Sequence, residues 1–487
     1  MSLLALLIAA LVIPFVGAAL IALAGRVPNL REAVTLATAG VLFLTVASIT
    51  PHVLAGARPQ LALFETLPGL LLAFRVEPLG MLFALVASGL WIVNSIYSIG
   101  YMRANREEHQ TRFYVYFAGS LGATMAIAFA GNLITLFLAY EALTLLTYPL
   151  VTHHGDEEAR HGGRVYLGYL LSTSIVLFLV AIVFTWSIAG TTDFLPGGIL
   201  GDRLSKAATG GLLALFMFGI GKAALMPVHR WLPAAMVAPT PVSALLHAVA
   251  VVKAGVFVVV KVIVYVFGVK NLAGLSSVDW LPFVAGLTIV LASIIALRSD
   301  NLKRRLAYST VSQLSYVVLA AALLTPLSIV GAVFHIAAHA VSKITLFFAA
   351  GAIYTTAHKT EVSQLDGIGR RMPVTMAAFT IGALSLIGVP PAAGFVSKWY
   401  IISGAAATGQ VGAIVVLIVS TLLNAAYFLP IVYAAFFRPL PEGDAVHGEA
   451  PMPILIALVA TASMVIALFF FADLPLHLAR QVAGLPG

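Results

Sequence analysis

The chain has 487 residues, of which 61% are hydrophobic and 9% are charged, and its formal net charge is +8. Soluble domains carry roughly 25% charged residues, so this composition excludes a soluble globular protein. The sequence contains no cysteine, which excludes disulfides, thiolate zinc sites and cysteine-ligated iron–sulfur clusters. We therefore expect a membrane protein with no cofactor of its own, in which any redox chemistry belongs to another chain.

The basic residues lie along short loops and form no block. This distribution favours a role in membrane orientation over nucleic-acid binding. The N-terminal stretch 1–24 is apolar, without a basic front end or a small-residue cleavage site. It predicts a first membrane span rather than a signal peptide.

Apolar runs of about 20 residues recur along the whole chain, and each is long enough to cross a hydrocarbon core of about 30 Å. They predict an all-α polytopic membrane protein. We expect about 14 transmembrane helices, at residues 3–25, 31–55, 78–100, 112–131, 133–152, 164–190, 209–229, 241–268, 280–298, 304–323, 327–355, 373–405, 411–436 and 452–472. Between the second and third, Gln60 to Val76 alternates polar and apolar residues around Pro68-Gly69. That pattern fits a short external hairpin, and a plain loop fits it equally well.

Two of these spans are interrupted in mid-run by Gly and Pro: the seventh over residues 219–227 and the twelfth over residues 388–398, each with a lysine. Unwound backbone in a membrane is tolerated only inside protein or beside water, so paired breaks suggest two structural repeats. We expect helices 4–8 and 9–13 to form inverted five-helix units. The predicted divisions are an N-terminal part (1–111), two half-channels (112–268 and 269–436) and a C-terminal part (437–487).

The distribution of Lys and Arg gives an orientation. With 14 spans, sixteen of these residues fall in the loops on one side and six on the other. Since Lys and Arg accumulate on the cytoplasmic side, both termini are predicted to lie on the outer side.

One acidic residue, Glu141, is predicted in mid-span, Glu77 lies at a span entrance, and the other acids are predicted in loops or tails. Five lysines also fall within spans: Lys222, Lys253, Lys261, Lys343 and Lys398. A central charge costs about 2.5–3.5 kcal/mol when it faces lipid, so these groups are expected to face one another or water. Lys261 is nearer a helix end, and snorkelling to the interface is the favoured interpretation for it.

Paired with Lys222, Glu141 forms a switch, because an approaching charge that separates the two sends the lysine proton onward. In the eleventh span His335, His339 and Lys343 recur every four positions and share one helical face, which predicts a proton relay. A structural hydrogen-bonding network remains the alternative for this stripe, and a core role remains the alternative for His247.

Several motifs do not fit a known site. Gly221-Lys222 lacks the earlier glycine and the following Ser or Thr of a phosphate loop, and His335-x-x-x-His339 lacks the glutamate of a zinc protease. A cluster between the fifth and sixth spans is interpreted as a solvated connection rather than a metal site; it comprises His153, His154, Asp156, Glu157, Glu158 and His161.

Over roughly residues 110–400 the chain resembles the antiporter-like subunits of Mrp-type cation/proton antiporters and of the respiratory complex I membrane arm. The most specific stretch runs from Gly221 to Gly255, with further matches over 303–313 and in the His335, His339 and Lys343 run. The resemblance implies 14 helices with broken seventh and twelfth, a coupling pair Glu141 and Lys222, and a connecting Lys253. It also implies a central relay of His335, His339 and Lys343, and a second-half lysine at Lys398.

The chain ends soon after the last predicted span, so it resembles the compact D-type Mrp subunit. We expect a proton-translocating subunit of a Na+/proton antiporter in a bacterial plasma membrane, partnered by other membrane subunits. Its proton-carrying residues are expected to be Glu141, Lys222, His247, Lys253, His335, His339, Lys343 and Lys398. The alternatives are a pump subunit of a complex I-type dehydrogenase or membrane-bound hydrogenase, and an inert scaffold. The mid-span charges count against the scaffold, because a scaffold would be more stable with leucine at each charged position.

Overall fold

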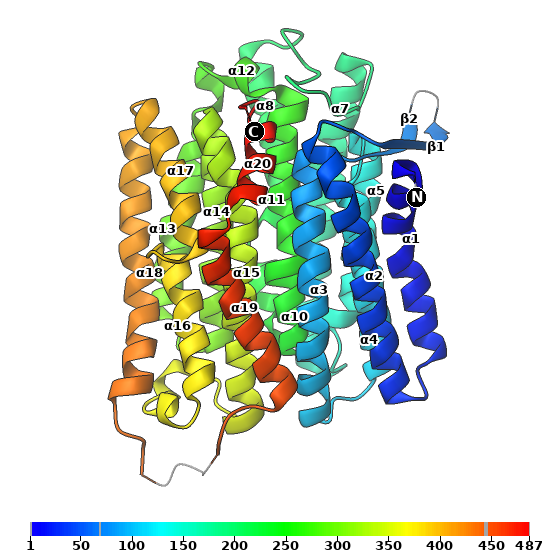
Figure 1. Cartoon of the computed structure of the whole chain (residues 1–487). Coiled ribbons are helices and arrows are strands. Elements are labelled where there is room, and N and C mark those ends of the chain that lie inside the picture. Colours follow the sequence, from blue (N-terminus) through cyan, green and yellow to red (C-terminus); the bar gives the residue numbers. More distant parts are fainter. Residues whose placement is uncertain (1, 68–69, 443–446, 487) are drawn as a thin grey trace.

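The computed structural model describes residues 2–67, 70–442 and 447–486. Most of them form helices that run roughly parallel to one another (Figure 1). Among the described residues, ten helical segments are long and apolar enough to cross a membrane. They are α1 (Leu3–Leu23), α2 (Pro28–Leu54), α3 (Pro78–Ala104), α5 (Leu133–Val151), the run Glu157–Ala189, the run Thr240–Phe267, the run Ser276–Arg298, α15 (Pro326–Ala357), α18 (Val411–Phe437) and α19 (Met452–Phe470).

Three of these runs contain several elements. The first comprises α6 (Glu157–Thr173), η1 (Ser174–Phe178) and α7 (Leu179–Ala189); the second comprises α10 (Thr240–Ala244), η4 (Leu245–Val249), α11 (Val251–Val262) and η5 (Ile263–Phe267); the third comprises η6 (Ser276–Val278) and α13 (Trp280–Arg298). The segments η1, η4 and η5 are π-helical. The hydropathy pattern did not predict these wider turns.

Four predicted spans fall outside the set of ten. Two correspond to α4 (Gln110–Ala128) and α14 (Leu302–Ala322), which are long enough but carry more polar side chains. The other two correspond to broken helices: α8 (Lys206–Gly219), and α16 (Pro373–Ile387) followed by α17 (Ala393–Ala407). The total of 14 transmembrane helices and the two inverted repeats therefore stay predictions.

The remaining described elements are short. They are β1 (Gln60–Leu67), β2 (Leu70–Arg75), η2 (Gly221–Ala223), α9 (Trp231–Ala234), η3 (Ala235–Val237), α12 (Val269–Leu272), η7 (Val362–Gln364), η8 (Ile368–Arg370) and α20 (Asp473–Val482).

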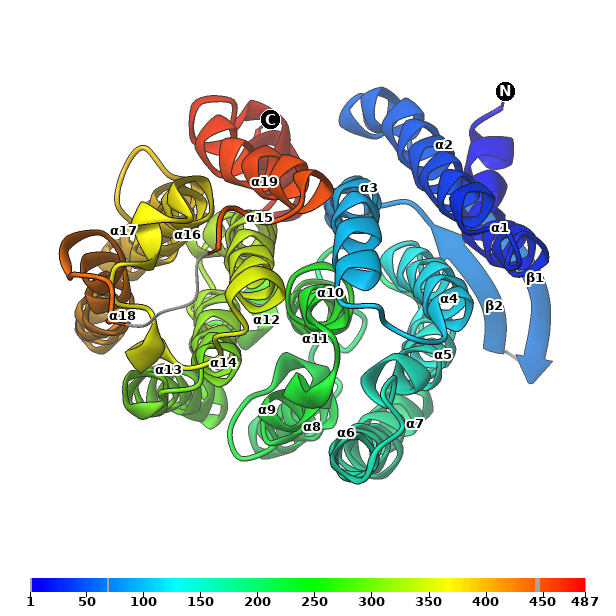
Figure 2. The same ribbon diagram turned by 90° about the horizontal axis from the view of Figure 1, so that it is seen from below.

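The core lies where the run Thr240–Phe267 and α15 cross the middle of the molecule (Figure 2). The most apolar parts of both are completely buried by the surrounding helices. Thr325 caps α15, because its side chain accepts from the Ser328 N–H while the Ser328 hydroxyl accepts from the Thr325 N–H. The two most deeply buried helical segments therefore form the axis around which the site is built.

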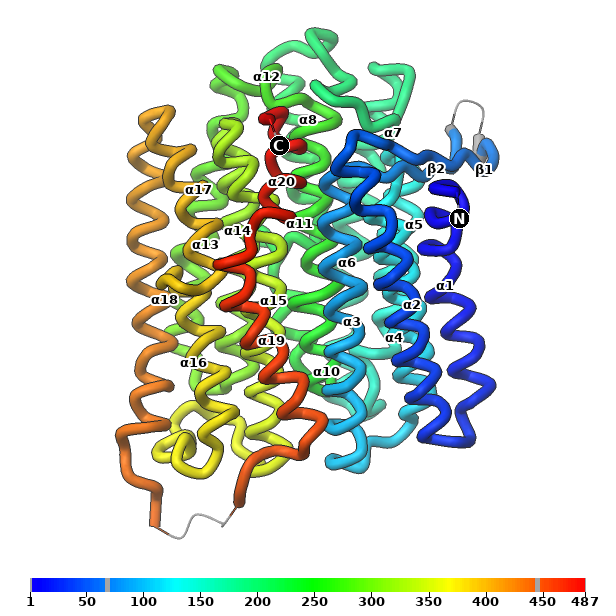
Figure 3. Tube along the Cα trace, in the orientation of Figure 1, coloured from blue at the N-terminus to red at the C-terminus, as the bar shows by residue number. Residues whose placement is uncertain are grey.

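Both expected helix breaks are present. α8 ends at Gly219, the chain makes one 3-10 turn that contains Lys222, and it re-forms a helix only at Trp231. The path of the chain through the labelled helices, α8 included, can be followed in Figure 3. α16 is followed directly by Gly388, whose φ of 91° belongs to the left-handed region that favours glycine. A Cβ at Gly388 would lie 2.6 Å from Cδ of Lys398, so the glycine also makes room for that side chain.

The segment from Gln60 to Val76 is a hairpin rather than a plain loop. β1 and β2 pair antiparallel, with Gln60 opposite Arg75 and Ala62 opposite Ala73. The expected Pro68-Gly69 turn lies outside the described residues. β2 also contacts the connection between α4 and α5, where the Arg75 N–H donates to the Phe129 carbonyl at 2.6 Å. This hydrogen bond fixes the hairpin to the connection between α4 and α5.

Both marked termini lie toward the end of the molecule that carries the hairpin and α12 (Figure 1). We call it the hairpin end, and the other the opposite end. The two marked termini therefore lie toward the same end of the molecule. Which face of the membrane the hairpin end meets stays a prediction from the Lys and Arg distribution.

Candidate functional site: a buried row of lysines and histidines

The eight predicted residues come from five separate parts of the fold. Two lie in the run Thr240–Phe267 and three in α15, while α5, η2 and α17 supply one each. Seven of the eight are buried, and the side chain of Glu141, on α5, is partly covered. The three-dimensional structure thus gathers in the core a set of ionisable groups that are far apart in the sequence.

Lys222 is held by the helix that carries Glu141. Its Nζ donates to the Tyr140 carbonyl at 2.8 Å and to the Thr144 hydroxyl at 2.6 Å. It also lies 3.2 Å from the centroid of the Tyr140 ring. Tyr140 in turn accepts the backbone N–H of Lys222 on its hydroxyl at 3.0 Å, so one turn of α5 fixes the lysine twice.

The expected direct pairing of Glu141 with Lys222 is not formed in this structure. Among the described residues, no group hydrogen-bonds to either carboxylate oxygen of Glu141, although both oxygens are buried. The physical reason is local: Tyr140 and Thr144 provide neutral acceptors for the ammonium closer than the carboxylate does. Glu141 is therefore an unpaired acid beside a neutrally coordinated amine.

Lys253 joins the central run to α15. Its Nζ contacts Nδ1 of His339. The His339 ring stacks on that of His335, one turn away, with centroids 5.9 Å apart. His335 continues the row, because its Nδ1 lies 2.8 Å from the Ser397 hydroxyl, next in sequence to Lys398.

Lys343 and Lys398 repeat the environment of Lys222. Nζ of Lys343 donates to the Ser309 hydroxyl at 2.6 Å and to the Leu306 carbonyl at 3.4 Å. Nζ of Lys398 donates to the Ile387 carbonyl at 2.7 Å and to the Thr421 hydroxyl at 3.2 Å. Each of the three amines is thus held by one carbonyl and one hydroxyl.

Tyr316 lies near both His335 and Lys398. Its ring centroid is 5.7 Å from that of His335 and 5.1 Å from Nζ of Lys398. His247, in the π-helical turn η4, packs on Phe347 with ring centroids 4.7 Å apart. Within the described residues, several buried polar atoms along the row have no hydrogen-bond partner: both ring nitrogens of His247, Nε2 of His335 and of His339, and the Tyr316 hydroxyl. Such atoms are costly to bury unless they bind water.

Sequence reasoning missed a buried acid–lysine pair, Glu77 with Lys261. Lys261 is 0% exposed and its Nζ lies 3.4 Å from Oε2 of Glu77, so the interpretation of Lys261 as a snorkelling residue is wrong. Glu77 directly precedes α3 and Lys261 lies on α11, where the two helices meet. In the sequence, Glu77 and Lys261 lie near the ends of two separate predicted spans. Such a pattern does not show that the two residues are partners.

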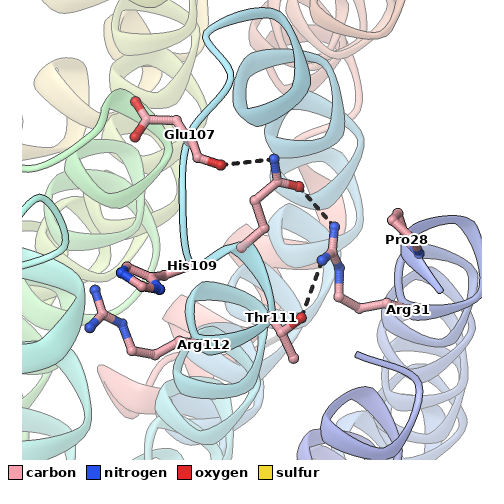
Figure 4. Close-up of a pocket in the computed structure, with 7 residues that line it drawn as sticks. Pro28, Arg31, Glu107, His109, Thr111 and Arg112 are labelled. Carbon is pink, nitrogen blue, oxygen red and sulfur yellow. Dashed lines mark hydrogen bonds between the residues drawn. The ribbon is translucent and has the colours of Figure 1, made fainter. Parts of the chain in front are cut away.

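Glu32 is predicted among the loop acids, although it lies at the very start of the predicted span 31–55, and the structure places it inside a helix. Glu32 lies on α2, buried, where Arg31 and Arg103 both pair with it. A cavity of about 490 Å³ adjoins this cluster at the opposite end of the molecule. The Arg31 guanidinium donates there to the Gln110 side chain at 2.8 Å and to the Thr111 hydroxyl at 3.2 Å. Figure 4 shows Arg31 and Thr111 pointing toward each other in this cavity.

The His153 cluster is only partly the solvated connection that the sequence suggested. His153 is buried, and burial lowers its pKa to about 4. The hydrogen bond to Glu107, 3.3 Å away, raises the pKa of the neighbouring His154. Across the described residues, no group of three or more His, Cys, Asp or Glu side chains is arranged to hold a metal ion.

A cavity of about 790 Å³ at the opposite end is lined by residues from 154–162, 233–240, 301–304 and 350–360. Glu107, Glu158 and Lys303 line it, and so do Tyr101 and Thr240, whose hydroxyls lie 3.5 Å apart. Thr240 begins the buried run that carries His247 and Lys253. The polar lining of this cavity therefore includes Thr240, the first residue of the buried run Thr240–Phe267.

Comparison with known proteins identifies the fold and the family. A chain in the structure of the Mrp complex from Dietzia sp. DQ12-45-1b has a TM-score of 0.86 at 21% identity, covering 99% of this chain and 97% of that one. Residues 130–424 match the family described as NADH:quinone oxidoreductase/Mrp antiporter, TM.

Two curated relatives come from different complexes. The chain is 32% identical over 386 residues to NADH-quinone oxidoreductase subunit N of Desulforudis audaxviator (strain MP104C), covering 78% of this chain and 75% of the relative. It is 30% identical over 436 residues to one of the Na(+)/H(+) antiporter subunits of Alkalihalophilus pseudofirmus (strain ATCC BAA-2126 / JCM 17055 / OF4), covering 82% of this chain. The chain spans about half of that relative, 52% of its length.

The fold and the buried row of amines define a polytopic, antiporter-like membrane subunit. The chain belongs to the NADH:quinone oxidoreductase/Mrp antiporter family. The family resemblance expected from the sequence is confirmed.

Proposed function

We propose that this chain is a proton-translocating subunit of a multisubunit monovalent cation (Na+)/proton antiporter. The observation that carries the proposal is the row of buried amines and imidazoles from Lys222 through Lys253, His339 and His335 to Lys398. Intramembrane ionisable groups destabilise a fold unless they serve a path or pair with one another. Most of these amines bind neutral acceptors instead of carboxylates, which suits groups that gain and lose a proton.

The first step of transport is assigned to Glu141 and Lys222. An ammonium at Lys222 is stabilised by the Tyr140 carbonyl and the Thr144 hydroxyl. When the Glu141 carboxylate approaches the Lys222 ammonium, the positive charge is held on Lys222. When the carboxylate withdraws, the ammonium gives its proton to the next group of the row. The unpaired state of Glu141 in this structure supports a mobile acid.

The central step passes through Lys253 and His339, which are in contact. A proton arriving on Lys253 moves to His339, along the stacked His335 ring, and through the Ser397 hydroxyl toward Lys398. The unpartnered ring nitrogens and the Tyr316 hydroxyl supply positions at which water completes the chain. Lys343, one turn beyond His339 on α15, provides a side branch of the relay, and His247 lies on the branch toward the 790 Å³ cavity.

The partners proposed are other membrane subunits in a bacterial plasma membrane, with both termini of this chain on the outer side. Their support is the likeness to a chain of the Mrp complex over nearly its full length. A sodium ion prefers several clustered oxygen ligands, whereas the row described here consists mainly of amines and imidazoles. We therefore assign proton movement to this chain and the cation route to one of its partners.

The test uses Glu141→Gln and Lys222→Met in the assembled complex, reconstituted into vesicles in which internal pH and sodium are followed together. Both variants are expected to lower sodium-driven proton exchange to the level of protein-free vesicles while the complex still assembles. Lys206→Met is the matched control, because it removes an exposed lysine outside the buried row. Wild-type exchange in either Glu141→Gln or Lys222→Met would refute the proposal.

The second candidate is a proton-pumping subunit of a complex I-type dehydrogenase or membrane-bound hydrogenase. This chain covers 75% of the length of the D. audaxviator relative but 52% of the length of the antiporter relative. This difference in coverage favours the second candidate. The same vesicle assay distinguishes the antiporter from the redox-driven pump. A sodium gradient alone moves protons in an antiporter, whereas a redox-driven pump moves them only when its electron donor is added.

A further inference from the structure

Among the ion pairs of the described residues, Glu77 and Lys261 form a deeply enclosed acid–base contact outside the row. Oε2 of Glu77 lies 3.4 Å from Nζ of Lys261, and the two residues are 3% and 0% exposed. Lys261 also donates to the Ala130 carbonyl at 2.8 Å. Its Nζ lies 4.3 Å from the centroid of the Phe194 ring. The ammonium is thus enclosed by one carboxylate, one carbonyl and an aromatic face.

A cavity of about 420 Å³ at the hairpin end reaches the other side of Glu77. Its wall includes Arg58, Arg75 and Lys270, together with Tyr265 and the C-terminal residues 481–484. Nε of Arg75 lies 4.0 Å from Oε1 of Glu77. One carboxylate oxygen therefore faces the cavity cations while the other faces Lys261, so Glu77 forms the boundary between cavity and core.

Lys261 is connected by its helix to the buried row. It follows Lys253 by eight residues on α11, a rise of about 12 Å. Phe257 lies midway, with its ring centroid 5.4 Å from Nζ of Lys261. Phe257 packs against Phe83 of α3 with centroids 5.0 Å apart, and both rings are fully buried. Two aromatic rings thus separate the Glu77–Lys261 pair from Lys253.

We propose that Glu77 and Lys261 form the site at which protons pass between the buried row and the cavity at the hairpin end, and that Phe83 and Phe257 form the barrier between this site and Lys253. The inference rests on the proposed function. In the outward direction, the Lys261 ammonium gives its proton to the Glu77 carboxylate, and the resulting carboxylic acid gives it to water in the cavity. The neutral amine of Lys261 then accepts the next proton from the row when the two rings part.

A purely structural role explains the pair less well. Buried ion pairs add little to stability, and replacing both partners by well-packed hydrophobic side chains of similar volume is often neutral or stabilising. Apolar residues would also close the cavity at a lower free-energy cost than a buried carboxylate between Arg75 and Lys261. A double neutral variant therefore separates the two roles, because it removes the proton chemistry without leaving a buried charge unpaired.

The experiment measures exchange in vesicles by the complex carrying Glu77→Gln with Lys261→Met, with rates divided by the amount of assembled complex. We expect wild-type assembly and thermal stability, and an exchange rate at least tenfold lower. A rate within twofold of wild type would show that the pair is structural and overturn the inference. If the double variant assembles poorly, Glu77→Asp and Glu77→Asn are compared instead, since they differ in ionisation but not in size. Equal normalised rates of these two would overturn it as well.

Two further measurements complete the test. Phe257→Ala is expected to raise the passive proton leak of the vesicles without a sodium gradient, and an unchanged leak would remove the barrier from the proposal. Glu141→Gln is run in parallel. If it abolishes exchange while the double variant does not, this inference fails and the proposed function stands; if Glu141→Gln keeps exchange, the proposed function itself fails.

Discussion

At the scale of single residues, the repeated environment of three lysines is the most informative feature. Lys222, Lys343 and Lys398 lie in different parts of the fold, yet each amine donates to one carbonyl and one Ser or Thr hydroxyl. A carboxylate partner would hold the proton on the amine, whereas a carbonyl and a hydroxyl stabilise it moderately. The hydroxyl can also donate back to a neutral amine, so both protonation states keep a hydrogen bond.

Removing one of these hydroxyls is expected to slow transport without unfolding the protein. Thr144→Val keeps the shape of the side chain and deletes the hydrogen bond to Lys222, a loss of about 0.5–1.5 kcal/mol. Exchange in vesicles should therefore fall by about 2- to 10-fold. Thr345→Val is the control, because Thr345 is equally buried but bonds only to its own helix, at the Val341 carbonyl. Equal rates for the two variants would contradict a role for the hydroxyl.

At the scale of elements, the breaks decide where the charges lie. The turn Gly221–Ala223 packs its backbone directly on α11, two residues from Lys253, and Gly255 makes this approach possible. A Cβ at Gly255 would lie 2.3 Å from the backbone N of Ala223 and 2.3 Å from the carbonyl carbon of Lys222. The unwound segment therefore depends on a helix surface without a side chain at that point.

Gly255→Ala is expected to move the Lys222 segment away from α11. Overpacking of this kind costs about 1–3 kcal/mol, and the displaced lysine lowers exchange. The thermal unfolding midpoint of the purified complex and the vesicle exchange rate are both expected to fall. Gly168→Ala, on α6, is the control, since a Cβ there meets nothing within 4 Å. It should be neutral or stabilising by about 0.5–1 kcal/mol. A Gly255→Ala protein as stable and active as Gly168→Ala would show that the close approach is not needed.

At the scale of the whole molecule, two completely buried segments form a shared axis, and cavities reach toward it from both ends. The 790 Å³ cavity reaches Thr240, at the start of one buried segment, and the 420 Å³ cavity reaches Glu77, the partner of Lys261 in the same segment. Between them lie the histidines, the lysines and the Phe83–Phe257 pair. Under the proposed function, these two cavities are the two sides from which protons reach the row, and the Phe83–Phe257 pair is the apolar packing on the hairpin-end side.

The orientation of this arrangement can be measured directly, because the chain has no cysteine. Asp202→Cys lies in an exposed loop at the hairpin end, and Glu157→Cys is exposed at the opposite end. If the hairpin end faces outward, a membrane-impermeant maleimide should label Asp202→Cys in intact cells and Glu157→Cys only after permeabilisation. The reverse pattern would overturn the orientation predicted from the Lys and Arg distribution.

Sequence alone determined the membrane class, the family, the two broken helices and the identity of most ionisable groups. The family followed from the resemblance over Gly221 to Gly255, and the other features follow from local patterns: apolar run length, Gly and Pro positions, and charges where charges are costly. The sequence could not show which of the groups are partners. Lys222 binds neutral acceptors beside Glu141, and Lys261 pairs with Glu77, which directly precedes α3. Only tertiary structure decided this, because side-chain contacts between helices depend on how the helices rotate and pack, and no short-range pattern records that.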